Sequence, residues 1–292
     1  MVAETYYNLY ANYWKDPAYA DTFVKSAYED AAMDEKMKSE LMKKGVAYQA
    51  NWMYVLHEFE DAIADCLAGD IFANDLTPSG DAPHAWDEGW AFYAGSLEGE
   101  TGGLTGAQLW NLGQKRCKDF GTCDGTIDNV NNRATANSKA LSLVQMGADK
   151  IAQKKCNDVQ TEFKLIVDQM SVPLLQGMIK YAFKSDKNND LGSCGDGDCP
   201  KEWAEGWAFA AAILPRINSC DQDVAAMIVE NLNTANDAPM STMGYAAFKM
   251  EVEKTYSCLG LTCADIGELQ NGAGVFSGME ACKDIDAPIA GY

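Results

Sequence analysis

The chain has 292 residues, of which 47% are hydrophobic and 23% are charged, so it can form one large or two ordinary globular domains and is unlike a disordered chain. Its net charge of −20 excludes broad attraction to nucleic acid or to an anionic membrane, because phosphate binding needs the opposite sign. No run of about 18 apolar residues is present, which predicts no membrane insertion. The first residues lack a basic and apolar leader, so we expect any signal peptide to be already absent.

Helical periodicity predicts two segments early in the chain, at about residues 17–46 and 46–68. The second has an apolar face formed by Val55, Leu56, Phe59, Ala62 and Ile63. Its opposite face carries five polar side chains at steps of three or four residues: Tyr54, His57, Glu58, Asp61 and Asp65. Such a stripe is usually a solvated face, but this one holds one of the two histidines in the chain.

The stretch GDAPHAWDEGWAFYAG, residues 80–95, predicts the next helix, with Asp81 as N-cap and Pro83 in the first turn. His84 and Glu88 are four residues apart and can reach one point, and Asp87 lies at the margin of their face. Aromatic residues on one side and small ones on the other predict a helix buried all round, in which a carboxylate needs a cation. The alternative is that the acidic residues only complement the helix dipole.

A second stretch, residues 189–209, repeats residues 74–92 and shares with them the motif Trp-x-Glu-Gly-Trp-Ala-Phe. It has Lys201 at the place of His84, which predicts a plain Lys201–Glu205 ion pair. Two helix-like segments precede it, at about 132–155 and 158–184.

Helical periodicity and the near absence of β-branched alternation predict an all-α fold, and the repeat predicts two pseudo-repeated helical-bundle lobes clipped by disulfides. The lobes cover residues 1–125 and 126–292, and residues 124–132 form the junction.

Ten cysteines are many for this length, and their spacing fits no four-cysteine zinc pattern. Four residues separate Cys194 from Cys199, and four separate Cys258 from Cys263. These spacings favour short-loop disulfides and hence a secreted, periplasmic or other oxidising location. The pairing of the remaining cysteines stays open.

Both histidines lie in the first lobe, each with a carboxylate at helical spacing, whereas residues 172–183 of the second lobe have neither. The sequence therefore predicts one metal site in the first lobe. Its candidate ligands are Tyr54, His57, Glu58, Asp61, His84, Asp87 and Glu88. These donors suit Fe³⁺, Fe²⁺, Mn²⁺ or Zn²⁺ better than Cu⁺, and phenolate with carboxylate favours Fe³⁺.

The segments HAWDEGWAFYAGS and EWAEGWAFAAAIL resemble the repeat signature of the algal Fe-assimilating proteins, a domain also found in phytotransferrins and more distantly similar to imelysin-like proteins. The resemblance implies a secreted or periplasmic iron-binding protein that assists uptake, with a cell-surface receptor as partner and carbonate as a candidate synergistic anion. The signature maps onto His84, Trp86, Asp87, Glu88, Gly89 and Trp90.

Two other functions remain open beside this non-enzymatic one. The chain could be a metal-dependent hydratase or hydrolase in which Glu58 or Glu88 acts as base toward a metal-bound water. It could also be a structural or interaction protein, with the tryptophan motif serving only as core and the acidic stripe exposed to solvent.

Overall fold

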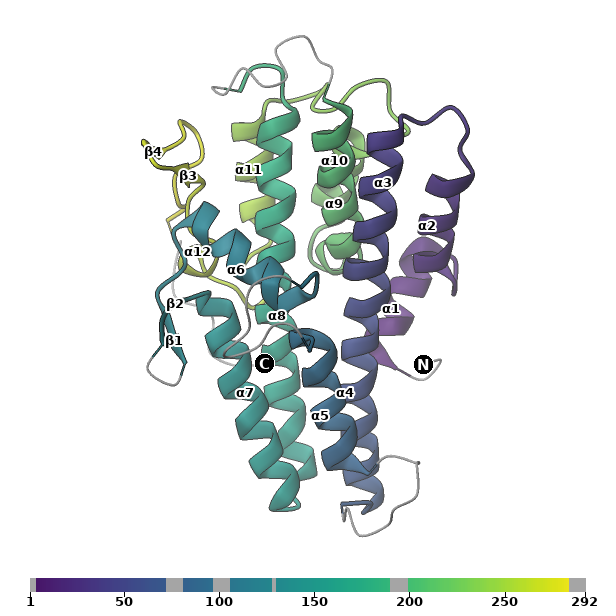
Figure 1. Cartoon of the computed structure of the whole chain (residues 1–292), viewed down its shortest axis with the longest axis vertical. Helices are drawn as coiled ribbons and strands as arrows, with labels where there is room; N and C mark the ends of the chain where they lie inside the picture. The colour runs from purple at the N-terminus through teal and green to yellow at the C-terminus, as the bar shows by residue number, and fades with distance from the viewer. Residues whose placement is uncertain (1–3, 72–80, 97–105, 128–129, 190–198, 284–292) are drawn as a thin grey trace.

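The computed structural model describes residues 4–71, 81–96, 106–127, 130–189 and 199–283, and these fold into an all-α protein (Figure 1). The helices are α1 (Thr5–Trp14), α2 (Tyr19–Glu29), α3 (Glu35–Gly45), α4 (Asn51–Ala68), α5 (Ala82–Ala94), α6 (Leu109–Phe120), α7 (Thr135–Ala152), α8 (Cys156–Ser185), α9 (Pro200–Cys220), α10 (Gln222–Leu232), α11 (Tyr245–Glu253) and α12 (Cys263–Ile266). Two small hairpins accompany them, β1 (Gly125–Ile127) with β2 (Val130–Arg133) and β3 (Gln270–Asn271) with β4 (Gly274–Val275). The predicted fold class is confirmed.

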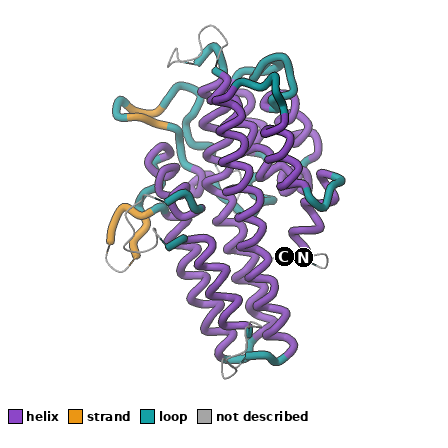
Figure 2. Tube along the Cα trace, turned by 45° about the vertical axis from the view of Figure 1, so that its right-hand side comes forward, coloured by secondary structure: helices purple, strands orange, loops and turns teal. Residues whose placement is uncertain are grey.

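Helix α8, 30 residues long, runs through most of the molecule and organises the packing (Figure 1). Its first half lies beside α4 and α7, and its second half beside α9 and α11. Figure 2 shows the same long helices side by side, with the strands confined to the periphery. Most of α8 is buried, because neighbouring helices cover it on several sides. No helix in the described ranges is long and apolar enough to cross a bilayer.

The predicted segments 17–46 and 46–68 differ from the observed helices in two places. The first is interrupted between α2 and α3, where Asp34 caps α3 by accepting from the backbone N–H groups of Lys36 and Met37. At residue 46 the chain does not break, because a π-helical turn (Val46–Ala50) joins α3 to α4. The site-bearing helix therefore continues directly from α3.

Helices from both predicted halves share one hydrophobic core. Helix α3 packs on α9, and α5 packs on α7, where the Trp86 indole donates to the Val144 carbonyl at 2.9 Å. A disulfide, Cys66–Cys156, joins α4 to α8. The division at residue 125 thus stays a prediction about an internal repeat, and the contacts between helices cross it.

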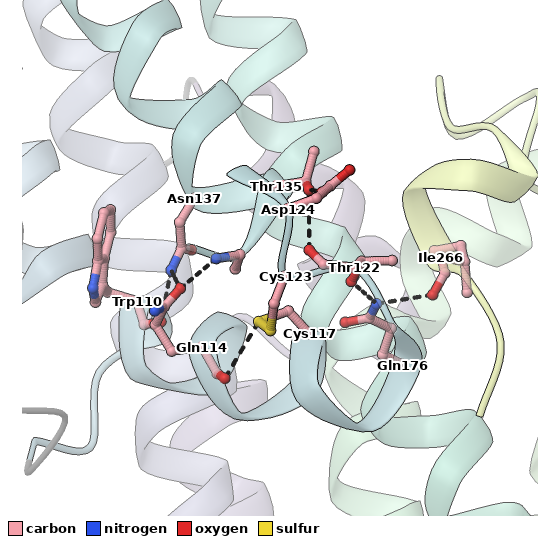
Figure 3. Close-up of a disulfide and its surroundings, with 11 residues drawn as sticks. Trp110, Gln114, Cys117, Thr122, Cys123, Asp124, Thr135, Asn137, Gln176 and Ile266 are labelled. Carbon is pink, nitrogen blue, oxygen red and sulfur yellow. Dashed lines mark hydrogen bonds between the residues drawn. A yellow bond between two sulfur atoms is a disulfide. The ribbon is translucent and has the colours of Figure 1, made fainter. Parts of the chain in front are cut away.

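The predicted junction, residues 124–132, forms most of the β1–β2 hairpin. Figure 3 shows the polar contacts beside it. Asn137 of α7 donates to the Trp110 carbonyl of α6 at 2.9 Å, and Gln176 of α8 donates to the Ile266 carbonyl at 2.9 Å. These bonds join α7 to α6 and α8 to α12 beside the junction.

Four disulfides occur within the described part of the chain. Cys117 bonds Cys123 (Figure 3), a pairing that the sequence analysis left open. Cys199 is also disulfide-bonded, whereas Cys194 lies outside the described residues, so the predicted Cys194–Cys199 loop stays a prediction.

The predicted pairing of Cys258 with Cys263 is wrong. Cys258 bonds Cys220, and Cys263 bonds Cys282. The turn that follows α11 brings Cys258 against the end of α9, with 5.8 Å between the Cα atoms of the bonded pair. Disulfides throughout the chain fit an oxidising compartment.

Candidate functional site

The site predicted from the sequence lies where α4 and α5 pack side by side (Figure 1). Gly89 of α5 lies close against α4, since a Cβ atom there would lie 2.8 Å from the ring of Phe59. The Phe59 ring in turn packs on Trp86, with 4.6 Å between ring centroids. The motif glycine thus allows α5 to approach α4 closely enough for polar side chains of the two helices to meet.

Helix α5 begins as predicted. Asp81 accepts from the His84 backbone N–H at 3.0 Å, which is the expected N-cap bond. His84 Nε2 lies 3.3 Å from Glu88 Oε1, so the predicted pair is formed.

The expectation that α5 is buried all round is wrong. The His84 and Glu88 side chains are 62% and 44% exposed, and Asp87 and Ala91 are also exposed. One face of the helix packs on the protein through Ala82, Ala85, Trp86, Gly89 and Tyr93, and its polar face remains open to solvent.

Glu58 of α4 meets Glu88 of α5, and this contact is the centre of the site. Glu58 is only 5% exposed. Burial raises the pKa of the Glu58 carboxyl, and the adjacent Glu88, through its charge and its hydrogen bond, raises that pKa further. The Tyr54 hydroxyl and the nearby His57 act in the opposite direction and limit the rise in pKa.

Tyr54 adds a phenol to the two carboxylates. Its hydrogen bond to Glu58 and the charge of Glu58 raise the Tyr54 pKa, and Glu88 and Asp61 contribute to the same effect. Tyr54, Glu58, Glu88 and His84 thus form a connected chain of side chains across two helices.

No lysine or arginine within the described ranges forms a salt bridge to Glu58 or Glu88. Two carboxylates in contact cannot both ionise cheaply unless a proton or another cation lies between them. The α4–α5 face therefore offers a cation two carboxylate groups, a phenol and an imidazole.

His57, the second predicted histidine ligand, takes a different partner. Its Nδ1 atom lies 2.5 Å from Glu4 Oε1, so His57 links α4 to the residue that precedes α1. His57 also lines a cavity of about 630 Å³ between α1, α4 and α8. The exposed Asp61 lines the same cavity. The two histidines thus have different partners, since His57 contacts Glu4 and His84 contacts Glu88.

Sequence reasoning missed Glu60, which lies in that cavity wall. Its Oε1 atom accepts from the Thr5 backbone N–H at 3.2 Å. Burial, followed by the charge of Glu4, raises the pKa of Glu60 to about 7. Glu60 lies between the polar and apolar stripes of α4, so helical periodicity gave no signal for it.

The described side chains include no group of three or more His, Cys, Asp or Glu residues gathered closely enough to hold a metal as they stand. On the α4–α5 face, Glu58 and Glu88 approach each other, and His84 is paired with Glu88. Cation binding here would need side-chain rearrangement, which the exposure of His84 and Glu88 permits.

In the second copy of the motif, the glutamate has a basic partner. The predicted Lys201–Glu205 pair is wrong as the main interaction of Glu205, because Lys44 of α3 lies 2.7 Å from Glu205 Oε1. Lys44 also pairs with Glu40 at 2.5 Å. Glu205 is thus a buried carboxylate whose negative charge is balanced by the ammonium group of Lys44.

The profile of the Fea1 family, described as low iron-inducible periplasmic protein, matches residues 12–282. The chain belongs to this family, as the tryptophan motif suggested, and its disulfides agree with a periplasmic location. No curated protein and no solved structure matches the chain.

Proposed function

We propose that this chain binds ferric iron at the α4–α5 face and so assists iron uptake in the periplasm. The observation that carries the proposal is the contact between Glu58 and Glu88, two carboxylates from different helices for which the described part of the chain supplies no basic residue as counter-ion. Membership of a low-iron-inducible periplasmic family supports iron as the cargo. The net charge of −20 would raise the local concentration of cations.

The donor set fits ferric iron best. Carboxylate and phenolate oxygens are hard ligands, and Tyr54 stands beside Glu58 with a phenol that a metal can deprotonate. His84 would supply nitrogen after turning from Glu88. Mn²⁺ and Zn²⁺ are the competing ions, since carboxylate and imidazole suit them as well.

The other predicted ligands take lesser parts in this proposal. Asp61 influences Tyr54 through its charge and lies at the rim, and Asp87 is exposed on α5. His57 would have to leave Glu4 to reach the metal. A synergistic carbonate and a cell-surface receptor remain predictions to which we assign no residues.

The test compares iron binding by the wild type and by the double variant Glu58→Gln, Glu88→Gln. Chelator-free protein is titrated with ferric citrate, and bound iron is measured by elemental analysis after gel filtration. We expect the double variant to bind iron about tenfold or more weakly, because both central carboxylates are lost. Parallel titrations with Mn²⁺ and Zn²⁺ determine which metal the site prefers.

The matched control is Glu29→Gln, Glu35→Gln, which removes two exposed carboxylates and changes the net charge equally. It should bind iron as the wild type does. Tyr54→Phe supplies a spectroscopic readout, because a ferric–phenolate bond absorbs visible light and its band should disappear. Wild-type iron stoichiometry and affinity in the double variant would refute the proposal.

A further inference from the structure

A second polar cluster, remote in sequence from the α4–α5 face, surrounds Arg116 of α6. Arg116 is only 8% exposed. Its Nε and Nη1 atoms are buried without a hydrogen-bond partner among the residues that the structure describes. These two atoms carry three of the five N–H donors of a guanidinium, while the Arg116 side chain also interacts with the Tyr181 hydroxyl.

The carboxylate that faces Arg116 is shared with a second cation. Arg116 Nη2 lies 3.1 Å from Asp119 Oδ2, and Lys180 Nζ of α8 lies 2.8 Å from Asp119 Oδ1. Arg116 and Lys180 thus share the single carboxylate of Asp119 as their ion-pair partner. Burial and the neighbouring Arg116 lower the pKa of Lys180, which the contact with Asp119 only partly offsets.

Further positive charge gathers around the ring of Tyr181. The guanidinium carbon of Arg116 lies 5.7 Å from the ring centroid, and the ammonium groups of Lys180 and Lys184 lie 6.0 and 5.7 Å from it. Lys184 also forms an ion pair with Glu202 at 3.8 Å. Cations packed this closely repel one another and attract an anion.

The buried Glu205, which also contacts Tyr181, is already engaged. Glu205 interacts with the Tyr181 hydroxyl and forms its ion pair with Lys44 of α3. Its charge is therefore divided between neighbours, and the unused donors of Arg116 stay without a carboxylate.

We infer that Arg116 and Lys180 form a binding site for a small oxyanion between α6 and α8. A planar guanidinium and an ammonium group are the donors that proteins use for phosphate, sulfate and carboxylate-type anions. The free donors of Arg116 would bind the anion oxygens, and Lys180 would supply a second charge. This site is independent of the iron face, because it shares no residue with it.

The experiment measures thermal unfolding of iron-free protein in low-chloride buffer at pH 8. Sodium phosphate, sulfate and bicarbonate are titrated separately, each against sodium chloride at equal ionic strength. A site that binds only the folded state raises Tm in a saturable way. We expect such a rise with at least one of these anions, and the anion that acts at the lowest concentration identifies the preferred ligand.

Two variants locate the effect. Arg116→Lys keeps the charge and loses the planar fork, and Lys180→Gln removes the second cation; each should shift the half-saturating concentration upward about tenfold. Lys254→Gln, an exposed change at the residue that follows α11, is the matched control and should leave the response unchanged. The inference is overturned if none of the anions raises Tm beyond chloride, or if both site variants respond as the wild type does.

Discussion

The two copies of the Trp-x-Glu-Gly-Trp-Ala-Phe motif, residues 86–92 of α5 and 203–209 of α9, are alike in packing and different in charge. In both, the first tryptophan donates its indole N–H to a main-chain carbonyl of another helix. Trp86 donates to Val144 at 2.9 Å, and Trp203 donates to Leu232 at 2.8 Å.

The motif phenylalanines also behave alike, since each packs against a tyrosine. Phe92 contacts Tyr54 with 4.7 Å between ring centroids, and Phe209 contacts Tyr48 and Tyr181 at 5.1 and 5.8 Å. The aromatic part of the motif therefore fixes helix packing in both copies.

The motif glutamates differ because the helices opposite them supply different side chains. Glu88 is half exposed and meets the carboxyl group of Glu58, whereas Glu205 is buried and meets the ammonium group of Lys44. The same local sequence thus provides one carboxylate that needs a cation and one that already has it.

The largest expected effect on stability comes from removing the ammonium group of Lys44, the counter-ion of Glu205. Lys44→Met should lower the free energy of unfolding by about 3–5 kcal/mol, because Glu40 and Glu205 would lose their common partner in a mostly buried position. Chemical denaturation at pH 7 measures the loss. Adding Glu205→Gln to this variant should restore part of the stability, since one uncompensated charge disappears.

Lys43→Met is the control for this prediction. Lys43 precedes Lys44, contacts the same Glu40 at 3.3 Å and is 65% exposed, so its loss should cost less than about 1 kcal/mol. Equal losses for the two lysine variants would contradict the assignment of Lys44 as the buried counter-ion.

The two motif glycines give the next largest contrast. At Gly89 a new Cβ would lie 2.8 Å from the Phe59 ring, so Gly89→Ala should destabilise the protein by about 1–3 kcal/mol through overpacking. At Gly206 the nearest atom, from Leu232, is 3.3 Å away, and the higher helix propensity of alanine should keep the change within about 1 kcal/mol.

Thermal or urea unfolding of both glycine variants provides the comparison. The wild-type chain is the reference, and crystal or NMR data on Gly89→Ala should locate the displacement at Phe59. A Gly206→Ala variant less stable than Gly89→Ala would mean that the second copy, and not the first, holds the tighter helix contact.

Residue patterns along single helices predicted much of this molecule. The apolar stripe of α4, the N-cap at Asp81 and the His84–Glu88 pair depend on spacing within one helix, and the structure has all three. Helical period alone determines which of these side chains share a face.

Contacts between distant segments were not predictable in this way. Glu4 and His57 are 53 residues apart, and Lys44 and Glu205 are 161 apart. Their meeting depends on how each helix is rotated about its axis against its neighbour, which no local pattern specifies. The prediction of a single site with both histidines depended on the same unspecified rotation.

The smallest expected effect is a pH-dependent increase in the free energy of unfolding caused by Glu58→Gln. The pKa of Glu58 is raised above its usual 4.5, so the folded state favours the protonated form. The wild type therefore keeps full stability below about pH 4.5 and loses some of it as the pH rises through the folded-state pKa. Without metal, the variant should equal the wild type near pH 4 and exceed it by up to about 1 kcal/mol at pH 8.

Ferric iron should reverse the order of stability, so that the wild type becomes more stable than Glu58→Gln. A cation bound by ionised Glu58 and Glu88 stabilises only the folded wild type, so iron at pH 7 should raise the wild-type Tm above that of Glu58→Gln. Glu29→Gln, an exposed change on α2, should follow the wild type in both series. If iron stabilises Glu58→Gln as strongly as the wild type, Glu58 is only a repulsive neighbour of Glu88, and the difference between the two motif copies is one of stability alone.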